Sequence, residues 1–221
     1  MTQTADDATS ALIYSPADVL ERAQNRLTLD LPEDVFSRDI PKIGDHNLNR
    51  AKFTYVGPGK PAAVMIPVVA RPQGATVLLT QRTQHLRAHP GQVAFPGGRM
   101  DPEDVSPAAA AFREAMEEIG LKADYATALG YLDAYQTGTG YRVIPLVAMV
   151  QPGFELMVNP DEVDATFEVP LEYLMEPDNQ QLHHKEIDGV MRSFYAFPFG
   201  ERYIWGVTAG ILHNFYERLY L

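Results

Sequence analysis

The sequence predicts an α/β protein with one hydrophobic core. Two near-continuous apolar runs, several shorter strand candidates and two amphipathic helices follow one another along 221 residues. A chain of this length fits one core better than two. Hydrophobic residues make up 46% of the chain and charged residues 21%, the balance of a globular protein that folds alone.

The charge balance and residue usage exclude several functions. Acidic residues outnumber basic ones by 29 to 18, and the net charge of -11 opposes binding to nucleic acid or to an anionic membrane surface. A polyphosphate substrate would therefore need a metal ion or local arginines. Without cysteine, the chain has no disulfide, zinc-thiolate site or thiol nucleophile. No apolar run approaches the ~18 residues of a membrane span, and no targeting peptide is visible, so we expect a cytoplasmic protein.

The first 59 residues are expected to precede the main domain. Residues 1–14 are mostly small and polar, which is typical of a disordered leader. Ser15 and Pro16 indicate the N-cap and first residue of a helix, with apolar residues following at helical spacing. The rest of the segment 15–59 is expected to connect this helix to a domain at 60–221.

The domain at 60–221 carries the pattern of a sheet with helices. Strands are expected where apolar runs are bounded by Gly, Pro and Asp, at 61–69, 76–79, 93–95, 128–135, 143–150 and 165–169. Helices are expected at 107–119 and 207–219, because apolar residues recur there at helical spacing.

Three glutamates of the helix at 107–119 are expected to share one face. At about 100° per residue, Glu114, Glu117 and Glu118 fall within a third of the helix circumference. Like charges at this spacing cost a few tenths of a kcal/mol per pair, so a compensating cation is expected. Carboxylate oxygens suit a hard divalent cation such as Mg²⁺, although the same letters without context would describe a solvated acidic face. The opposite face should pack on the core through Phe112, Met116 and Ile119.

The residues around this helix resemble the Nudix box. Gly97 and Gly98 precede the helix and let the backbone approach a ligand or ion closely. Together with residues 113–121, REAMEEIGL, they are similar to the consensus G-x5-E-x7-R-E-U-x-E-E-x-G-U. The loop is one residue longer, because 14 residues rather than 13 separate Gly98 from Arg113. The candidates for the loop acid are Asp101, Glu103 and Asp104.

A second motif, at 78–98, resembles the signature of the coenzyme A branch of the Nudix family. That signature reads L-L-T-x-R-S-x3-R-x3-G-x3-F-P-G-G, and only Thr83 departs from it. Arg82 and Arg87 offer planar donors for phosphate oxygens, or alternatively form structural ion pairs. Phe95 and Gly97 of the same motif are further candidates for contact with the substrate. The resemblance continues through 137–141, 160–163 and 204–206.

The resemblance implies a fold and a reaction. The fold would be the Nudix α/β/α sandwich, a mixed sheet between helices with the box as a loop-helix-loop against one sheet edge. The activity would be hydrolysis of a diphosphate with Mg²⁺ or Mn²⁺, and coenzyme A would yield 3',5'-ADP and 4'-phosphopantetheine. Glu114, Glu118 and Gly98 would hold the metal, with Glu117 as a third ligand or the general base. Arg113 would orient a glutamate, and Glu162 would supply a further ligand or base unless it is only a solvated turn residue.

Two other functions stay open. The first is a Nudix hydrolase of another substrate, such as ADP-ribose, a dinucleoside polyphosphate or a nucleoside triphosphate. The second is a non-catalytic module that binds a nucleotide and regulates a partner. Such modules commonly lose box acids, whereas this chain keeps all three glutamates and Arg113. Family members often dimerise, so the resemblance also leaves a homodimer open.

Overall fold

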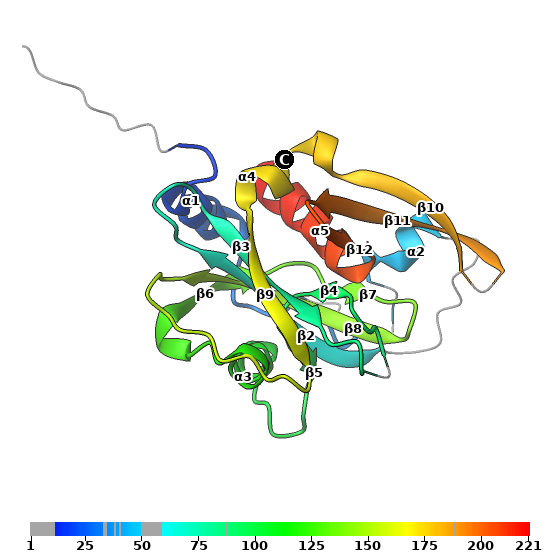
Figure 1. The fold of residues 1–221 in the computed structure, drawn as a ribbon, viewed down its shortest axis with the longest axis horizontal. Helices are drawn as coiled ribbons and strands as arrows, with labels where there is room; N and C mark the ends of the chain where they lie inside the picture. The colour runs from blue at the N-terminus through cyan, green and yellow to red at the C-terminus, as the bar shows by residue number, and fades with distance from the viewer. Residues whose placement is uncertain are drawn as a thin grey trace, which may run out of the picture.

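The computed structural model describes residues 12–32, 35–37, 39, 41–49, 59–86, 88–187 and 189–221. Within these ranges, nine strands form one mixed sheet and three form a separate antiparallel sheet. Helices α1 and α5 lie on one face of the main sheet and α3 on the other (Figure 1). The fold is therefore α/β with an α/β/α arrangement, as predicted.

Runs of strands are separated by single helices along the chain. The main sheet contains β1 (Ile43–Gly44), β2 (Lys60–Val69), β3 (Thr76–Arg82), β4 (Val93–Ala94), β5 (Gly97–Arg99), β6 (Ala126–Tyr131), β7 (Tyr135–Gln136), β8 (Tyr141–Val150) and β9 (Val163–Pro170). The second sheet contains β10 (Gln181–Ile187), β11 (Val190–Phe199) and β12 (Arg202–Trp205). The helices are α1 (Pro16–Arg26), α2 (Asp45–Leu48), α3 (Pro107–Ile119), α4 (Leu171–Met175) and α5 (Val207–Tyr220), with short 3₁₀ turns at Ala123–Tyr125 and Pro177–Asn179.

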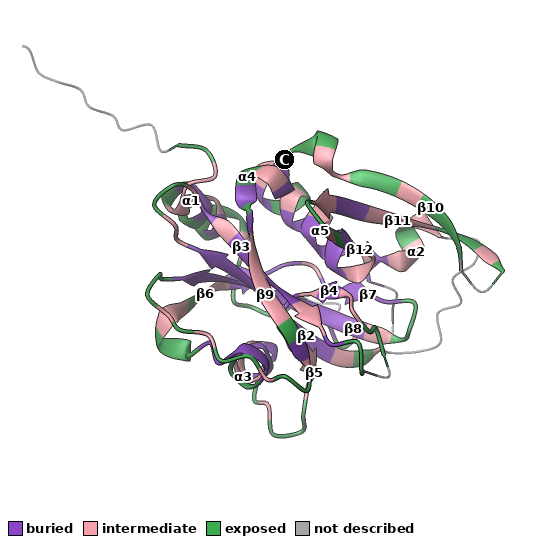
Figure 2. Ribbon diagram, viewed as in Figure 1, coloured by how far each residue is buried: buried purple, intermediate pink, exposed green. Residues whose placement is uncertain are grey.

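The parallel pair β2 and β8 forms the centre of the main sheet. Neighbouring strands follow the order β1-β7-β8-β2-β3-β4, while β5, β6 and β9 pair with β2, β8 and β3, respectively. Residues 60–69 of β2 lie in register with residues 141–150 of β8. Successive residues of β2 alternate between two apolar clusters, with Ile66 and Val68 on the α5 side and Met65 and Val69 on the α3 side. Both faces of the central strands are therefore buried (Figure 2).

Local sequence signals placed the starts of α1 and α3 correctly. The Ser15 hydroxyl accepts a hydrogen bond from the Asp18 amide, and the Ser106 hydroxyl accepts one from the Ala109 amide. A proline follows each serine, where its missing N–H is not needed. Helix α3 ends at Gly120, whose φ of 69° is a left-handed conformation that favours glycine.

The prediction of one strand over 128–135 was wrong, because the chain forms β6 and β7 with a break between them. Opposite this break lies Pro145 of β8, which has no N–H to donate to a ladder. The Leu132 amide instead donates to the Pro145 carbonyl at 3.0 Å. Strands β10–β12 were not predicted either, and their outer strand β10 is largely polar and exposed (Figure 2).

The buried face of α3 also differs from the prediction. Met116 is 46% exposed, and the face against the sheet is formed by alanines together with Ile119 and Glu118. The small side chains let the helix pack closely on the face of the central strand β2, rather than against a sheet edge. Because α3 packs on the sheet through this face, one of the three box glutamates is buried and another is exposed.

The N-terminal segment is more structured than predicted. Within the expected leader, the Tyr14 ring packs at a tilt against the Tyr220 ring, with the centroids 5.1 Å apart, and the Tyr14 carbonyl accepts from the Ala75 amide. The expected leader boundary at residue 14 is thus too late, while residues 1–11 lie outside the described ranges. The expected connection over 15–59 contains β1 and α2 in addition to α1. None of the described helices is long and apolar enough to cross a membrane.

Candidate active site

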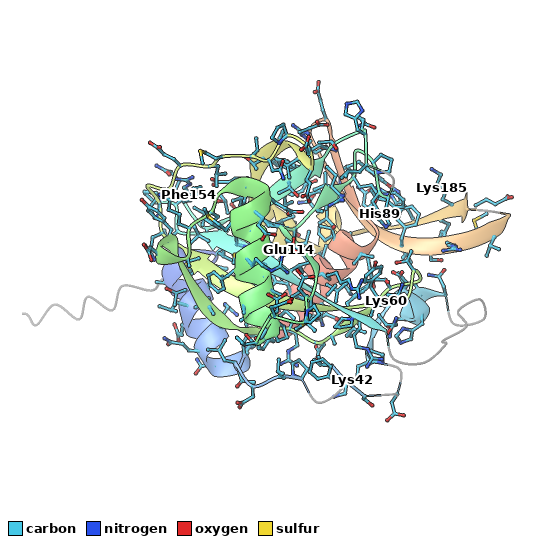
Figure 3. All side chains as sticks on the ribbon, turned by 90° about the horizontal axis from the view of Figure 1, so that it is seen from below. Lys42, Lys60, His89, Glu114, Phe154 and Lys185 are labelled. Atoms are coloured by element: carbon cyan, nitrogen blue, oxygen red, sulfur yellow. The ribbon has the colours of Figure 1, made fainter. Side chains whose placement is uncertain are left out.

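The two glycines of β5 lie directly against the acidic residues of α3. The Gly97 amide donates to Glu118 Oε2 at 3.1 Å. A Cβ at Gly98 would lie 2.6 Å from Glu114 Oε1, so only glycine leaves room for this carboxylate. Gly97 has a φ of 153° and packs on the backbone of Ala63 in β2. Figure 3 looks onto α3, with Glu114 near the middle of the helix. Pairing of β5 with β2 therefore sets the positions of two box carboxylates.

Arg113 links the loop before α3 to the helix itself. Its Nε and Nη2 donate to the two carboxylate oxygens of Asp104, at 3.1 and 2.8 Å. Its Nη1 donates to Glu114 Oε1 and to Glu117 Oε2, both at 3.0 Å. These bonds raise the pKa of Arg113 and lower that of Asp104. Among the three candidate loop acids, Asp104 makes the two-point contact, Asp101 lies 3.8 Å from Arg113, and Glu103 is exposed.

Burial separates the three glutamates that were expected to project together. Glu118 is 3% exposed, Glu114 is half-buried, and Glu117 is exposed. Arg113 holds Glu114 and Glu117, whereas Glu118 turns toward Gly97. In the part of the chain that the structure describes, no three acidic or histidine side chains are already gathered as a ligand set. The helical spacing was correct, but the contacts of each carboxylate were not predictable from it.

The buried carboxylates have raised pKa values. Loss of hydration raises the pKa of Glu118 to about 7, against the opposing effects of the Gly97 amide and of Arg82, whose Nη1 lies 3.8 Å from Glu118 Oε1. Burial also raises the pKa of Glu114, although Arg113 opposes it. Glu162 raises both values further by like-charge repulsion. The negative charges of these acids therefore oppose one another at an energetic cost.

These residues fit a divalent cation. Their donor atoms are carboxylate oxygens, which Mg²⁺ and Mn²⁺ prefer. A cation beside Glu118 and Glu114 would relieve both the like-charge repulsion and the desolvation that raise their pKa values. The glycine at position 98 leaves space for the Glu114 carboxylate on this side.

A cleft of about 510 Å³ adjoins the acidic helix on the other side of β5. Gly97, Gly98 and Arg82 line the cleft and also contact the box glutamates. The remaining walls come from strands β2 and β8, from α5 and β12, and from β11. Phe95, predicted to contact the substrate, is buried in the core and lines this cleft, whereas the predicted Arg87 lies outside the described residues.

Several cleft residues were not found from the sequence. They lie in elements far from the two motifs and are Asp45, Asn49, Arg192, Phe194 and Thr208. No spacing pattern joins them, because the sheet order brings together segments more than 100 residues apart. Trp205 also lines the cleft and contacts Phe194 edge-on, with the ring centroids 5.2 Å apart.

The fold and the acidic helix beside the cleft define the class, an α/β/α sandwich with a Nudix-type box. Residues 59–194 match the model of the NUDIX domain family. Over 195 residues the chain is 34% identical to the Yersinia pestis (strain Pestoides F) protein named "Uncharacterized Nudix hydrolase NudL", covering 88% of this chain and 92% of that one. The Yersinia pseudotuberculosis (serotype O:1b) protein of that name shows the same values. The chain therefore belongs to the Nudix hydrolases.

A likeness to solved structures is also found. The Nudix hydrolase RenU from M. Smegmatis is 24% identical, with a TM-score of 0.43, over 51% of this chain and 71% of that one. The MutT/nudix family protein from Enterococcus faecalis is 15% identical, with a TM-score of 0.46, over 75% of this chain and 64% of that one.

The raised pKa of Glu118 predicts how the stability of the metal-free protein depends on pH. A carboxyl that keeps its proton to about pH 7 when folded, but only to its usual value near 4.5 when unfolded, favours the folded state at low pH. This contribution is complete below about pH 4.5 and is lost as pH rises through 7. In EDTA, the melting temperature should therefore fall by several degrees between pH 5 and pH 8. Mg²⁺ at pH 8 should restore it.

The matched control is an exposed carboxylate on the same helix. Glu117→Gln should keep the wild-type loss of stability over this pH range, whereas Glu118→Gln should flatten it and remove the Mg²⁺ effect. Melting curves of the three proteins at each pH would check this. Equal pH dependence in all three would contradict the assignment to Glu118.

Proposed function

We propose that this Nudix hydrolase cleaves the diphosphate of coenzyme A or a close derivative, with Mg²⁺ or Mn²⁺ as cofactor and 3',5'-ADP and 4'-phosphopantetheine as products. The observation that carries this proposal is that two glycines lie between the box acids and the cleft. Gly97 and Gly98 belong to both, since each lines the cleft and touches a box glutamate. A diphosphate held over β5 would therefore lie beside Glu114 and Glu118.

The choice of coenzyme A rests on the motif at 78–98, to which the cleft adds physical support. Its volume of about 510 Å³ lies within the range of sites for small organic ligands, about 300–1,000 Å³. Arg82 lies at the boundary between cleft and acids, and its buried Nε has no hydrogen-bond partner among the described residues. A phosphate oxygen would satisfy this donor. In an acidic chain, this cation is the expected attachment point for an anionic substrate.

The box residues would have different roles in the reaction. Glu114 and Glu118, with the Gly98 backbone, would hold the cation, and Glu117 would be either a third ligand or the general base; the bound cation would neutralise the diphosphate and acidify a water. Arg113 keeps Glu114 and Glu117 in place through its anchorage on Asp104. Glu117 is exposed and is our first choice to take a proton from the attacking water. Glu162, whose negative charge raises the pKa of both buried carboxylates, is the second.

The test is to identify the products from several diphosphates. The full-length protein is incubated with coenzyme A, ADP-ribose or ATP in the presence of Mg²⁺, Mn²⁺ or EDTA, and the products are separated by chromatography and assigned by phosphorus NMR. We expect 3',5'-ADP and 4'-phosphopantetheine from coenzyme A only with metal. Preferential cleavage of ADP-ribose or ATP would overturn the substrate. Metal-dependent turnover of none of them would favour a non-catalytic nucleotide-binding module.

A further inference from the structure

Part of the cleft wall comes from Asp45 and Asn49, in the segment 43–49 that precedes the residues matched by the Nudix family model. Strand β1 in this segment pairs in parallel with β7, aligning Ile43 with Tyr135 and Gly44 with Gln136. The fit is close, because a Cβ at Gly44 would lie 2.4 Å from the Gln136 carbonyl oxygen. The segment is thus part of the main sheet through β1.

The strand order makes the cleft a trough across the sheet. From the box glycines outward, the strands are β5, β2, β8, β7 and β1. The register is continuous, since Val64 of β2 lies opposite Gly97, and Val143 of β8 lies opposite Ala62 and Tyr135. The cleft lining covers β5, β2 and β8, which span roughly 10 Å at about 4.8 Å per gap between strands, and it continues over residues 137–139 in the loop after β7. Such a shape suits an extended substituent better than a compact one.

Two side chains of the N-terminal segment hold the far end of this trough together. Asp45 accepts from the Tyr135 hydroxyl at 2.8 Å and from the Gly138 amide at 2.6 Å, and so fixes the loop after β7. Asn49 donates to the Ser193 carbonyl at 3.0 Å and accepts from the Ser193 amide at 2.9 Å. These bonds connect the β7–β8 loop, through α2, to strand β11. Both walls of the trough therefore depend on this segment.

The lining of the trough shows which chemistry it would accept. Its floor and sides are largely apolar, with Val64, Val143, Phe194, Trp205 and Ile211. Hydroxyl and amide groups interrupt this apolar surface, and they belong to Thr137, Thr139, Thr208 and Asn49. The lining also includes the acidic Asp45 and the basic Arg82 and Arg192. An uncharged chain with alternating apolar and amide groups matches this lining better than a second phosphate does.

We propose that the trough binds the linear pantetheine arm of the substrate, and that Asp45 and Asn49 are positioning residues that set this specificity. The identity of the arm rests on the proposed function. In this arrangement the diphosphate lies over β5, and the arm extends over β2 and β8 toward β1. The nucleoside half then lies on the opposite side of the box acids, outside the trough.

The test measures the binding of each half of the substrate separately, so it does not depend on hydrolysis. Binding of 4'-phosphopantetheine and of 3',5'-ADP is measured by titration calorimetry or ligand-observed NMR, in the presence of Mg²⁺, for the full-length wild type and Asn49→Ala. We expect Asn49→Ala to weaken binding of 4'-phosphopantetheine about tenfold, since loss of the Ser193 clamp releases one wall. Binding of 3',5'-ADP should change less than twofold.

Asn47→Ala is the matched control, because Asn47 lies two residues before Asn49, and within the described part of the chain its side chain bonds to the nearby Lys42 carbonyl and does not line the cleft. It should bind both fragments like the wild type. The proposal is overturned if the wild type does not bind 4'-phosphopantetheine, or if Asn49→Ala weakens both fragments equally or neither. If coenzyme A is hydrolysed although one of these results is found, the proposed function still holds. If the fragments show the expected binding pattern but coenzyme A is not hydrolysed, only the proposed function is rejected.

Discussion

Replacement of Glu118 by glutamine is expected to lower kcat by about three orders of magnitude, or about 4 kcal/mol of transition-state stabilisation, without unfolding the protein. The amide has the size of the carboxylate, and its oxygen can still accept the hydrogen bond from the Gly97 amide. What it lacks is the negative charge that would hold the cation. Steady-state rates with coenzyme A over a range of Mg²⁺ concentrations measure the loss.

The fold of this variant is checked separately. Circular dichroism and the melting temperature in EDTA should show a native protein, since Glu118 is 3% exposed and its charge costs desolvation energy. Excess Mn²⁺ should not restore the rate, because the charge itself is lost. A well-folded Glu118→Gln variant with wild-type kcat would refute the assignment of Glu118 as a metal ligand.

Gly98→Ala is expected to lower turnover about 100-fold while largely keeping the fold. The added methyl group would meet the Glu114 carboxylate at 2.6 to 2.8 Å, and a flexible side-chain end can move away. The displaced carboxylate would leave the position that Arg113 holds, and misplacement of a catalytic group by about 1 Å costs on the order of 100-fold. Rates and melting temperature of the same preparation measure the two effects.

The contrasting substitution lies one residue earlier. Gly97→Ala should destabilise the whole protein, because its φ of 153° disfavours a side chain and the new Cβ would lie 2.4 Å from the Ala63 carbonyl oxygen. Backbone atoms of β2 cannot move aside without breaking the pairing with β5. If Gly98→Ala lost as much stability as Gly97→Ala, Gly98 would have no distinct role in seating Glu114.

Short-range signals in the sequence determined much of the fold. The serine-proline pairs at 15–16 and 106–107 predicted both helix starts, because N-capping depends on residues within one turn. Long apolar runs predicted β2 and β8, since parallel strands buried on both faces need continuous apolar sequence. The motif at 97–121 predicted the residues that the structure brings together around Gly97, Gly98 and α3.

Only the tertiary structure decided how these parts are used. Helical periodicity places three glutamates on one face, but packing on β2 through alanines buried Glu118 and left Glu117 exposed. The break between β6 and β7 depends on Pro145 of a neighbouring strand, which no local pattern of residues 128–135 contains. The far wall of the cleft joins Asn49 to Ser193 across 144 residues. Local sequence can encode capping, spacing and strand formation, whereas burial of a charge and closure of a cleft depend on which distant segments the sheet brings together.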